Sequence, residues 1–465
     1  MIIGLAGGAF TALGWLEIYP PLCGLIAALC FSYAIKSSTP YLSVYIGGVL
    51  AIGAAFYWLI GTIESFGGFS LIPSLLIYLF FVLASASSFL VAVYFYKGLP
   101  SFLPRVAISF TAVELLPYLL FPWKFGHLLL EVTPVAQLAS IGGASLLTFV
   151  LFMFAESIVN KRAKYFIISL AILSIGFLIK AESQNHLLNV TVVQANVSTE
   201  KKRDVLSFVD NLSRYIELTP KDPKSLVIWP ESVFQEWIHE GIRFKHQDPR
   251  LEKLPNNFIF GSLTFESEIK YYNSALAIKP NGEILPPYHK RVLMPFGEFM
   301  PLADKFPSLL ALNPQVGQFS AGKKPRVWDF GSFKISPLIC YEDIVPSMSR
   351  DSVLEGAELL VNLTNDAWFG DSFAPTQHNR IASFRAIENG RYLIRSTNSG
   401  KTAVINPKGQ ITAQLPHFSD GVLNTSVSPS KNQTIYSKYV GEGVGFFSLY
   451  LSLCFMVLSW VRKKI

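Results

Sequence analysis

Long apolar runs fill the first 180 residues of the chain and return once near its C-terminus. The runs lie at residues 2–16, 18–35, 43–62, 70–95, 101–120, 138–159, 165–180 and 443–461. An α-helix needs about 20 apolar residues to cross the hydrocarbon core of a bilayer, and most of these runs approach that length. The pattern therefore predicts a polytopic α-helical membrane domain of about eight helices, in which the first two runs form a tight hairpin.

Residues 187–430 show a different pattern, in which short apolar segments alternate with helical spacing. Strand character covers 187–197, 225–229, 257–265, 272–278, 333–340 and 358–363, and helical spacing covers 204–218 and 374–389. Gly390 follows the second helix at the position of a C-cap. We expect an extramembrane α/β domain with layered, mixed sheets, which ends in short strand and turn signals over 391–427.

The charged residues divide the chain at the same points. Of the 39 basic and 32 acidic residues, only 13 lie in residues 1–180. The first segment is too apolar for a soluble domain, which excludes a wholly cytosolic enzyme, whereas the second has ordinary globular composition. We therefore expect a transmembrane domain of seven helices at 1–180, an extramembrane domain at 187–430, and a transmembrane helix with a basic tail at 443–465.

The basic residues between the apolar runs predict the orientation, because cytoplasmic loops carry an excess of Lys and Arg. The even-numbered connections and the C-terminal tail carry Lys36, Lys97, Arg105, Lys161, Arg162, Lys164, Arg462, Lys463 and Lys464. The odd-numbered connections carry Glu17, Glu64, Lys124 and Glu131. Both termini are therefore expected in the cytoplasm, with residues 181–440 on the outer side. Much of the net charge of +7 is this signal, so we expect no nucleic-acid partner.

Three residues with reactive side chains stand at or between predicted strand ends, where layered α/β sheets bind their ligands. Glu231 follows the segment 225–229, Cys340 ends the segment 333–340, and Lys290 lies between them. A cysteine at a strand-to-helix turn is favoured as thiolate by the positive end of the helix. A carboxylate could take its proton, and an ammonium could stabilise an oxyanion. Taken singly, each residue also fits a structural role: a loop acid, a surface lysine or a buried thiol.

The motifs around these residues carry a family resemblance. WPES, HKRVLMPFGEF, PLICYED and NLTNDAWFG occur in this order and together resemble the nitrilase, or carbon–nitrogen hydrolase, superfamily. The resemblance implies an α-β-β-α sandwich and a triad with Glu231 as general base, Lys290 as transition-state stabiliser and Cys340 as nucleophile. By the same resemblance, Asn273, Glu298, Tyr341 and Glu342 are assigned supporting roles.

The membrane segment and the single returning helix narrow the resemblance to the apolipoprotein N-acyltransferase family. PFGEFMP, NDAWFGDS and the segment 385–400 are similar to that family in particular. The chain departs from its pattern at Lys201-Lys202-Arg203, because the family usually carries a tryptophan after the lysine.

The resemblance implies transfer of an acyl chain from a phospholipid to the α-amino group of the diacylglyceryl-cysteine of an apolipoprotein. Cys340 would hold the acyl group as a thioester in a ping-pong reaction. The implied partners are a phospholipid donor, a diacylated apolipoprotein acceptor and the surrounding membrane lipids. The implied location is the bacterial inner membrane, with the catalytic domain on the periplasmic side. We expect no cofactor and, because H-E-x-x-H and C-x-x-C motifs are absent, no metal.

Residues 292–312 are unusually apolar for a loop next to a lysine of the predicted triad. Phe299 and Met300 in this loop, with Trp368 after NDA, are candidates for a mobile cover that dips into the membrane interface and admits acyl chains. Core packing is the other interpretation of the same residues.

Three other functions fit parts of the sequence. A membrane-tethered amidase would use the same triad on a soluble amide, with water as the second nucleophile. A transporter or receptor would use the outer domain only for binding, although the apolar runs show no inverted repeat. A papain-like pair would join Cys340 to His289 or His378.

Overall fold

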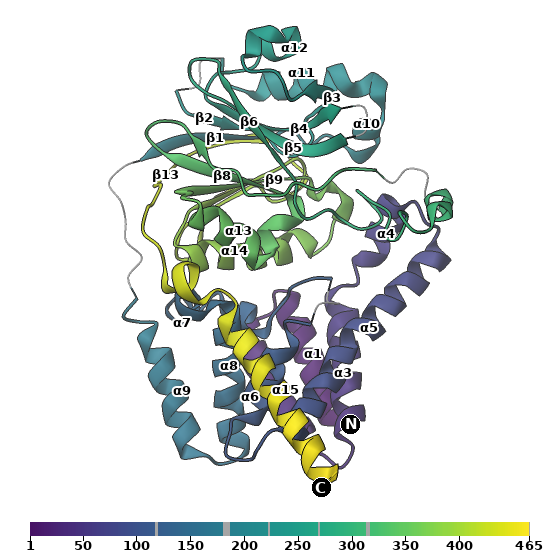
Figure 1. Cartoon of the computed structure of the whole chain (residues 1–465), viewed down its shortest axis with the longest axis vertical. Helices are drawn as coiled ribbons and strands as arrows, with labels where there is room; N and C mark the ends of the chain where they lie inside the picture. The colour runs from purple at the N-terminus through teal and green to yellow at the C-terminus, as the bar shows by residue number, and fades with distance from the viewer. Residues whose placement is uncertain (117–119, 180–186, 222–223, 268–269, 313–316, 465) are drawn as a thin grey trace.

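The computed structural model describes residues 1–116, 120–179, 187–221, 224–267, 270–312 and 317–464. Helices form the lower half of the molecule, and two sheets with flanking helices form the upper half (Figure 1). The last helix, α15 (Gly443–Lys464), runs back from the upper half along the lower bundle. The described chain therefore has the predicted order of a helical region, an α/β domain and a final apolar helix.

The lower bundle is built from the predicted apolar runs. Its α-helices are α1 (Ile2–Trp15), α2 (Pro20–Ala34), α3 (Pro40–Ala55), α4 (Leu59–Gly67), α5 (Leu71–Gly98), α6 (Arg105–Val113), α7 (Thr133–Ala136), α8 (Ala139–Val159) and α9 (Ala163–Ile175). Among the described residues, α5, α8 and α15 are long and apolar enough to cross a membrane, and α3 with α4 forms a fourth candidate bent by 53°. The helices α1, α2 and α9 are apolar but shorter.

Two of the predicted runs differ from single straight spans. The run at 43–62 is broken between α3 and α4. The run at 101–120 gives only α6, whose nine residues extend about 14 Å and cannot cross a bilayer alone. Residues 117–119 of that run lie outside the described part of the chain. The predicted hairpin of α1 and α2 is present, with Glu17 and Tyr19 in left-handed conformations at its turn.

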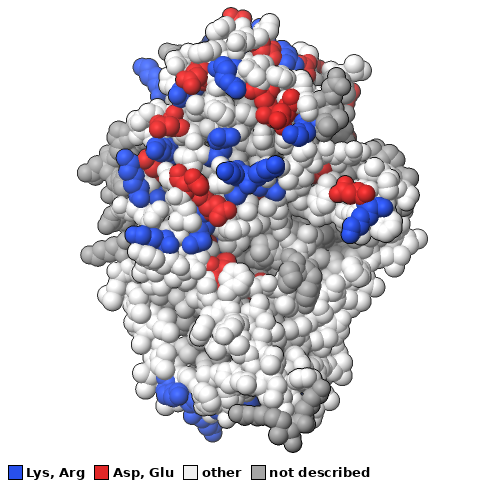
Figure 2. All heavy atoms as spheres, in the orientation of Figure 1, with Lys and Arg blue, Asp and Glu red and all other residues white. Residues whose placement is uncertain are grey.

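The basic connections of the bundle lie together at the end far from the sheets. Lys36 Nζ donates to Asn160 Oδ1 at 2.8 Å, and Arg162 donates to the main-chain oxygen of Ser101 at 2.6 Å. On the face drawn in Figure 2, most charged residues lie in the upper half, and the charged residues visible in the lowest part are basic. The bundle therefore has one basic end and one end that meets the α/β domain.

The α/β domain contains two sheets that mix parallel and antiparallel pairs. The first has the order β13-β1-β2-β4-β5-β6, with β3 paired to β4, and the second has the order β12-β11-β10-β9-β8-β7. The strands are β1 (Leu188–Gln194), β2 (Leu226–Ile228), β3 (Phe234–His239), β4 (Phe258–Ser267), β5 (Lys270–Ile278), β6 (Ile284–His289), β7 (Trp328–Asp329), β8 (Lys334–Ile339), β9 (Leu359–Thr364), β10 (Leu393–Thr397), β11 (Ala403–Ile405), β12 (Ile411–Gln414) and β13 (Gly421–Val427).

The two sheets pack face to face and each carries helices on its outer side, which gives the predicted α-β-β-α sandwich. Buried side chains such as Ile228 from the first sheet and Ile339 and Val361 from the second form the shared core. The helices α10 (Thr199–Arg203), α11 (Phe208–Leu218) and α12 (Pro249–Glu252) flank the first sheet, and α13 (Pro346–Leu354) and α14 (Ala374–Asn389) flank the second.

The helix α14 joins the two halves of the molecule. It lies between the second sheet and the membrane helices in Figure 1. Its Ile381 and Phe384 belong to the same buried apolar cluster as the bundle. Its Arg380 pairs with Glu17 at 2.5 Å and with Glu131, both in odd-numbered connections. The odd-numbered connections therefore face the α/β domain.

The predicted strands all form, and the helix predicted at 374–389 has those bounds, with Gly390 at φ +62° as its cap. The helix predicted at 204–218 begins only at Phe208, because a 3₁₀ turn precedes it. The strands β3, β6 and β7 escaped prediction. In β6, two adjacent prolines remove the usual strand signal.

Candidate active site

Three strand ends bring the predicted triad into one buried pocket. Glu231 follows β2, Lys290 follows β6 directly and Cys340 follows β8 directly. Lys290 Nζ lies 3.6 Å from Glu231 Oε1, and both charges act on the thiol of Cys340. Glu231 and Lys290 are buried and Cys340 is half-buried. The carboxylate, the ammonium and the thiol therefore share one low-dielectric site.

A second carboxylate, Glu298, and an amide, Asn273, both expected from the sequence to support the site, lie in the same pocket. Glu298 Oε2 lies 2.8 Å from Lys290 Nζ. Asn273 Nδ2 lies 2.8 Å from Oε1 of Glu231 and 2.8 Å from Oε1 of Glu298, so it bridges the two acids. One lysine and one amide thus hold two carboxylates in fixed positions.

The backbone at Cys340 is strained in a way that suits a nucleophile. Its φ is +53°, a left-handed conformation that non-glycine residues rarely adopt outside functional sites. Asn362 Nδ2 donates to the main-chain oxygen of Cys340 at 2.8 Å, and Thr364 hydrogen-bonds its thiol. The sharp turn projects the sulfur from the end of β8 toward the pocket.

Glu342 fixes the two strand ends relative to one another. Its Oε2 accepts from the amide of Ile339 at 2.8 Å and from the hydroxyl of Tyr288 at 2.7 Å. Its Oε1 accepts from the amide of Val292 at 3.1 Å. Because these donors come from both strand ends, the buried Glu342 sets the spacing between the lysine and the thiol.

The turn that carries Glu231 depends on a glycine in the neighbouring strand. A Cβ on Gly261 would lie 2.5 Å from the amide nitrogen of Ser232 and 2.6 Å from the Cα of Glu231. Ser232 itself has φ +49°. Only glycine therefore allows β4 to approach this turn closely enough to hold the carboxylate in place.

Burial raises the pKa of the Cys340 thiol well above its usual value, and the carboxylate of Glu231 raises it further, against the opposing charge of Lys290. The resting thiol is therefore protonated at neutral pH, and the expectation that the turn favours thiolate is wrong. The element after Cys340 is a five-residue 3₁₀ turn, Cys340–Ile344, whose dipole is too small to offset desolvation. The thiol needs a base beside it to react.

Lys290 remains protonated in this setting. Burial alone would lower its pKa, but the carboxylates of Glu298 and Glu231 raise the pKa of Lys290 well above its usual value. A fixed positive charge is what an oxyanion next to the thiol requires.

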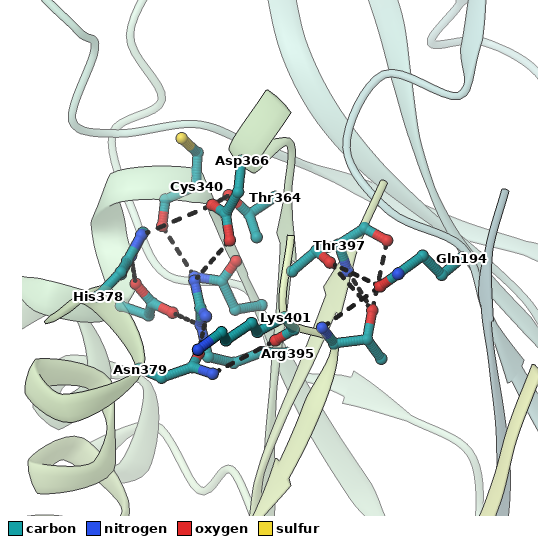
Figure 3. A network of polar contacts seen from close by, with 12 residues as sticks. Gln194, Cys340, Thr364, Asp366, His378, Asn379, Arg395, Thr397 and Lys401 are labelled. Carbon is teal, nitrogen blue, oxygen red and sulfur yellow. Dashed lines mark hydrogen bonds and ion pairs between the residues drawn. The ribbon is translucent and has the colours of Figure 1, made fainter. Parts of the chain in front are cut away.

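Neither histidine of the papain-like alternative is placed as the base. The His289 ring lies 2.9 Å from Ser274 Oγ and 3.2 Å from Glu240, and burial lowers the pKa of His289 to about 4. His378 Nε2 lies 2.5 Å from Asp343 Oδ1. In Figure 3 the sulfur of Cys340 points away from His378.

A fully buried polar network behind Cys340 was missed by the sequence analysis. Arg395 Nε lies 2.6 Å from Asp343 Oδ2, and Arg395 also contacts Asn379, while Asp343 holds His378 (Figure 3). The charges of His378 and Arg395 oppose the effect of burial and lower the pKa of Asp343. An arginine in the middle of a fully buried strand, β10, is the signal that could have found this network.

Tyr341 points to the membrane side of the turn. Its hydroxyl donates to the main-chain oxygen of Leu120, and its ring lies 6.2 Å from Phe121. Phe121 also packs 5.6 Å from Trp58, which is 5.1 Å from Phe369. Aromatic rings therefore line the junction between Cys340 and the bundle, a feature that the sequence analysis did not anticipate.

The candidate cover residues differ in exposure. Phe299 and Trp368 are half-buried, and Met300 is 7% exposed. The main-chain oxygen of Trp368 accepts from Ser65 Oγ of α4 at 3.2 Å. Among the side chains of the same loop that the structure describes, the large apolar ones that are exposed are Phe296, Leu302 and Phe306.

Comparisons with known proteins match both halves of the chain. The carbon–nitrogen hydrolase family profile matches residues 189–436, and that of the apolipoprotein N-acyltransferase N-terminal domain matches residues 7–156. The apolipoprotein N-acyltransferase of Geobacter metallireducens is 31% identical over 74% of this chain and 71% of its own. The apolipoprotein N-acyltransferase of Vibrio parahaemolyticus is 30% identical over 98% of this chain and 96% of its own. A solved amidase from Nesterenkonia sp., at 20% identity and a TM-score of 0.38, covers 52% of this chain and 91% of its own. The chain therefore belongs to the apolipoprotein N-acyltransferase family.

Proposed function

We propose that this N-acyltransferase moves an acyl chain from a membrane phospholipid to the N-terminal α-amino group of a diacylated apolipoprotein, through a thioester on Cys340. The observation that carries the proposal is the pocket itself. A protonated lysine and two carboxylates surround a protonated thiol on the side of the sandwich that meets an apolar helical bundle. Family membership supports an apolipoprotein acceptor and a lipid donor.

In the first half-reaction, Glu231 accepts the thiol proton as the sulfur of Cys340 attacks the ester carbonyl carbon. The raised pKa of the thiol makes this proton transfer concerted with the attack. Lys290 stabilises the oxyanion of the tetrahedral intermediate. The carbon–oxygen bond then breaks, and the lysophospholipid leaves with the proton from Glu231.

In the second half-reaction, the amine of the apolipoprotein attacks the thioester carbon. A carbon–nitrogen bond forms and the carbon–sulfur bond breaks. Glu231 accepts the proton of the amine and returns it to the sulfur, which restores the resting thiol. Glu298 and Asn273 keep Lys290 and Glu231 aligned through both steps.

The loop 292–312 is proposed to cover the pocket and to admit acyl chains. Phe299 and Met300 of this loop, together with Trp368, are the candidate cover residues from the sequence. The exposed Leu302 and Phe306 are available to contact lipid. Exposed apolar side chains beside a lysine of the pocket support this role.

The protein is proposed to lie in the bacterial inner membrane with its α/β domain on the periplasmic side and both termini in the cytoplasm. The basic connections at one end of the bundle support this orientation. The odd-numbered connections that contact α14 support the opposite side for the α/β domain.

Mass spectrometry of the full-length protein after exposure to phospholipid tests the reaction. An acyl adduct on Cys340 that a diacylated lipopeptide discharges, and that water discharges slowly, is the expected result. Cys340→Ala serves as the control without adduct. Release of ammonia from a simple amide, with no adduct from phospholipid, would overturn the proposal in favour of an amidase.

A further inference from the structure

A second lysine lies against the turn that carries Glu231. Lys202, in α10, donates from Nζ to the main-chain oxygen of Glu231 at 3.1 Å. This lysine comes from outside the strand ends that supply the triad, and its side chain is half-buried. Lys202 therefore places a second ammonium next to the main chain of Glu231.

The short helix that carries Lys202 is held on several sides. Ser198 Oγ accepts from the amide of Lys201 at 3.4 Å. Asn211 Nδ2 donates to the main-chain oxygen of Lys201 at 2.9 Å, and Gln235 donates to that of Lys202. The backbone of α10 is therefore fixed, and the ammonium reaches Glu231 from a set position.

The charges of the pocket explain what this cation contributes. Glu231 and Glu298 share Lys290, so two carboxylates face one ammonium inside a buried site. A second ammonium, hydrogen-bonded to the main chain of Glu231, adds positive charge beside this pair of acids and holds the turn that carries one of them.

We propose that Lys202 is a positioning residue for acyl-enzyme formation, which holds the Glu231 turn through a hydrogen bond to the main-chain oxygen of Glu231. The inference rests on the proposed function, in which Glu231 is the base. A charge-assisted hydrogen bond from an ammonium is stronger than one from a neutral amine, so this hold on the turn requires Lys202 to be protonated.

The protonation of Lys202 changes within an accessible pH range. Burial lowers the pKa of Lys202 to about 8, and the carboxylate of Glu231 opposes this effect. Beyond Glu231, the charged groups of the pocket are Lys290, which lies 3.6 Å from Glu231, and Glu298, which Asn273 links to Glu231. The charged neighbours of Lys202 along the chain, Glu200, Lys201 and Asp204, are exposed. The ammonium is therefore present below pH 8 and lost above it.

Single-turnover formation of the acyl-enzyme tests the proposal, with the full-length protein in detergent micelles containing phosphatidylglycerol and no acceptor. Omitting the acceptor removes the titration of its amine, and this donor has no group that titrates between pH 6 and 10. The rate in the wild-type protein should fall above about pH 8 as Lys202 loses its proton. Lys202→Arg, whose guanidinium does not titrate in this range, should show no such fall.

Lys202→Met should form the acyl-enzyme about tenfold more slowly at pH 7, from the loss of a hydrogen bond to a charged group. Lys201→Met is the matched control, since that neighbouring side chain is exposed, and it should behave as wild type.

A fall above pH 8 that persists in Lys202→Arg, or a wild-type profile in Lys202→Met, would overturn the proposal. Glu231→Gln separates this failure from that of the proposed function. If Glu231→Gln forms the acyl-enzyme at the wild-type rate, the assigned base is wrong. If Glu231→Gln is inactive while both Lys202 variants match wild type, only the role of Lys202 is wrong.

Discussion

Two buried clusters of charge, one in the pocket and one at the junction with the bundle, look alike in composition and differ in arrangement. In the pocket, Lys290 is shared by Glu231 and Glu298. At the junction, Arg385 pairs with Glu388 at 2.8 Å inside α14. Both clusters are almost fully shielded from water.

The junction cluster uses its charges to join elements. Glu388 Oε1 accepts from the amide of Ala144 at 3.1 Å, where Gly142 and Gly143 break the helical conformation of α8. A helix that restarts there has free amides, and a carboxylate satisfies one of them. In the pocket, the corresponding charges surround a thiol. Buried charge alone therefore does not identify an active site, and the feature on which the proposed site rests is an ammonium shared by two acids beside a thiol.

Substitution of the pocket lysine should give the largest effect. Lys290→Met removes the positive charge at the oxyanion and should slow acyl-enzyme formation by about a thousandfold. The measurement is single-turnover adduct formation on Cys340 by mass spectrometry. A loss below tenfold in a folded variant would place the pocket in the same structural class as the junction.

The pH dependence of alkylation tests the environment of the thiol. Because the pKa of Cys340 is raised, only its small thiolate fraction reacts at neutral pH, and the rate with iodoacetamide should still rise about tenfold per pH unit near pH 9. The peptide containing Cys340 is followed by mass spectrometry. Glu231→Gln removes a charge that raises this pKa and should react faster at the same pH. A plateau below pH 9 in the wild-type protein would contradict the assigned environment.

A substitution at the junction should lower the stability of the protein and hardly change the rate of acyl-enzyme formation. Glu388→Gln removes the carboxylate that pairs with the buried Arg385, and breaking a buried pair costs about 3 kcal/mol. Thermal unfolding in detergent should show a lower midpoint, with acyl-enzyme formation per folded molecule within about twofold of wild type. An unchanged midpoint with lost activity would remove the distinction between the two clusters.

The proposed cover should give the smallest effect. Leu302→Ser and Phe306→Ser should reduce turnover on phospholipid vesicles by about threefold, because each exchanges an exposed apolar contact with lipid for a hydroxyl. Turnover of a short-chain ester should stay unchanged. Equal losses on both substrates would show that the loop packs structurally and does not meet the membrane.

The layered, mixed sheets could be predicted from the sequence because their strands are short, apolar and bounded by turns, whereas the sandwich arrangement followed from the family resemblance. The grouping of Glu231, Lys290 and Cys340 in one pocket could be expected because each lies inside a motif of that resemblance, although the strand before Lys290 was not predicted. The raised pKa of Cys340 could not be predicted from the sequence, since it depends on burial that only the packed sheets create. The role of Glu342 as a tie between two strand ends depends on contacts distant in sequence. The bend between α3 and α4 lies within one continuous apolar run, so hydropathy could not locate it.

A double-mutant cycle on Glu231 and Lys290 tests most directly whether the pocket acts as one chemical unit. The rates of acyl-enzyme formation are compared in Glu231→Gln, Lys290→Met and the double variant. Residues that act together are strongly non-additive, so the double variant should be no more than about threefold slower than the slower single variant. Losses that multiply across the two substitutions would show that the acid and the ammonium act independently, and the account of a single catalytic pocket would be wrong.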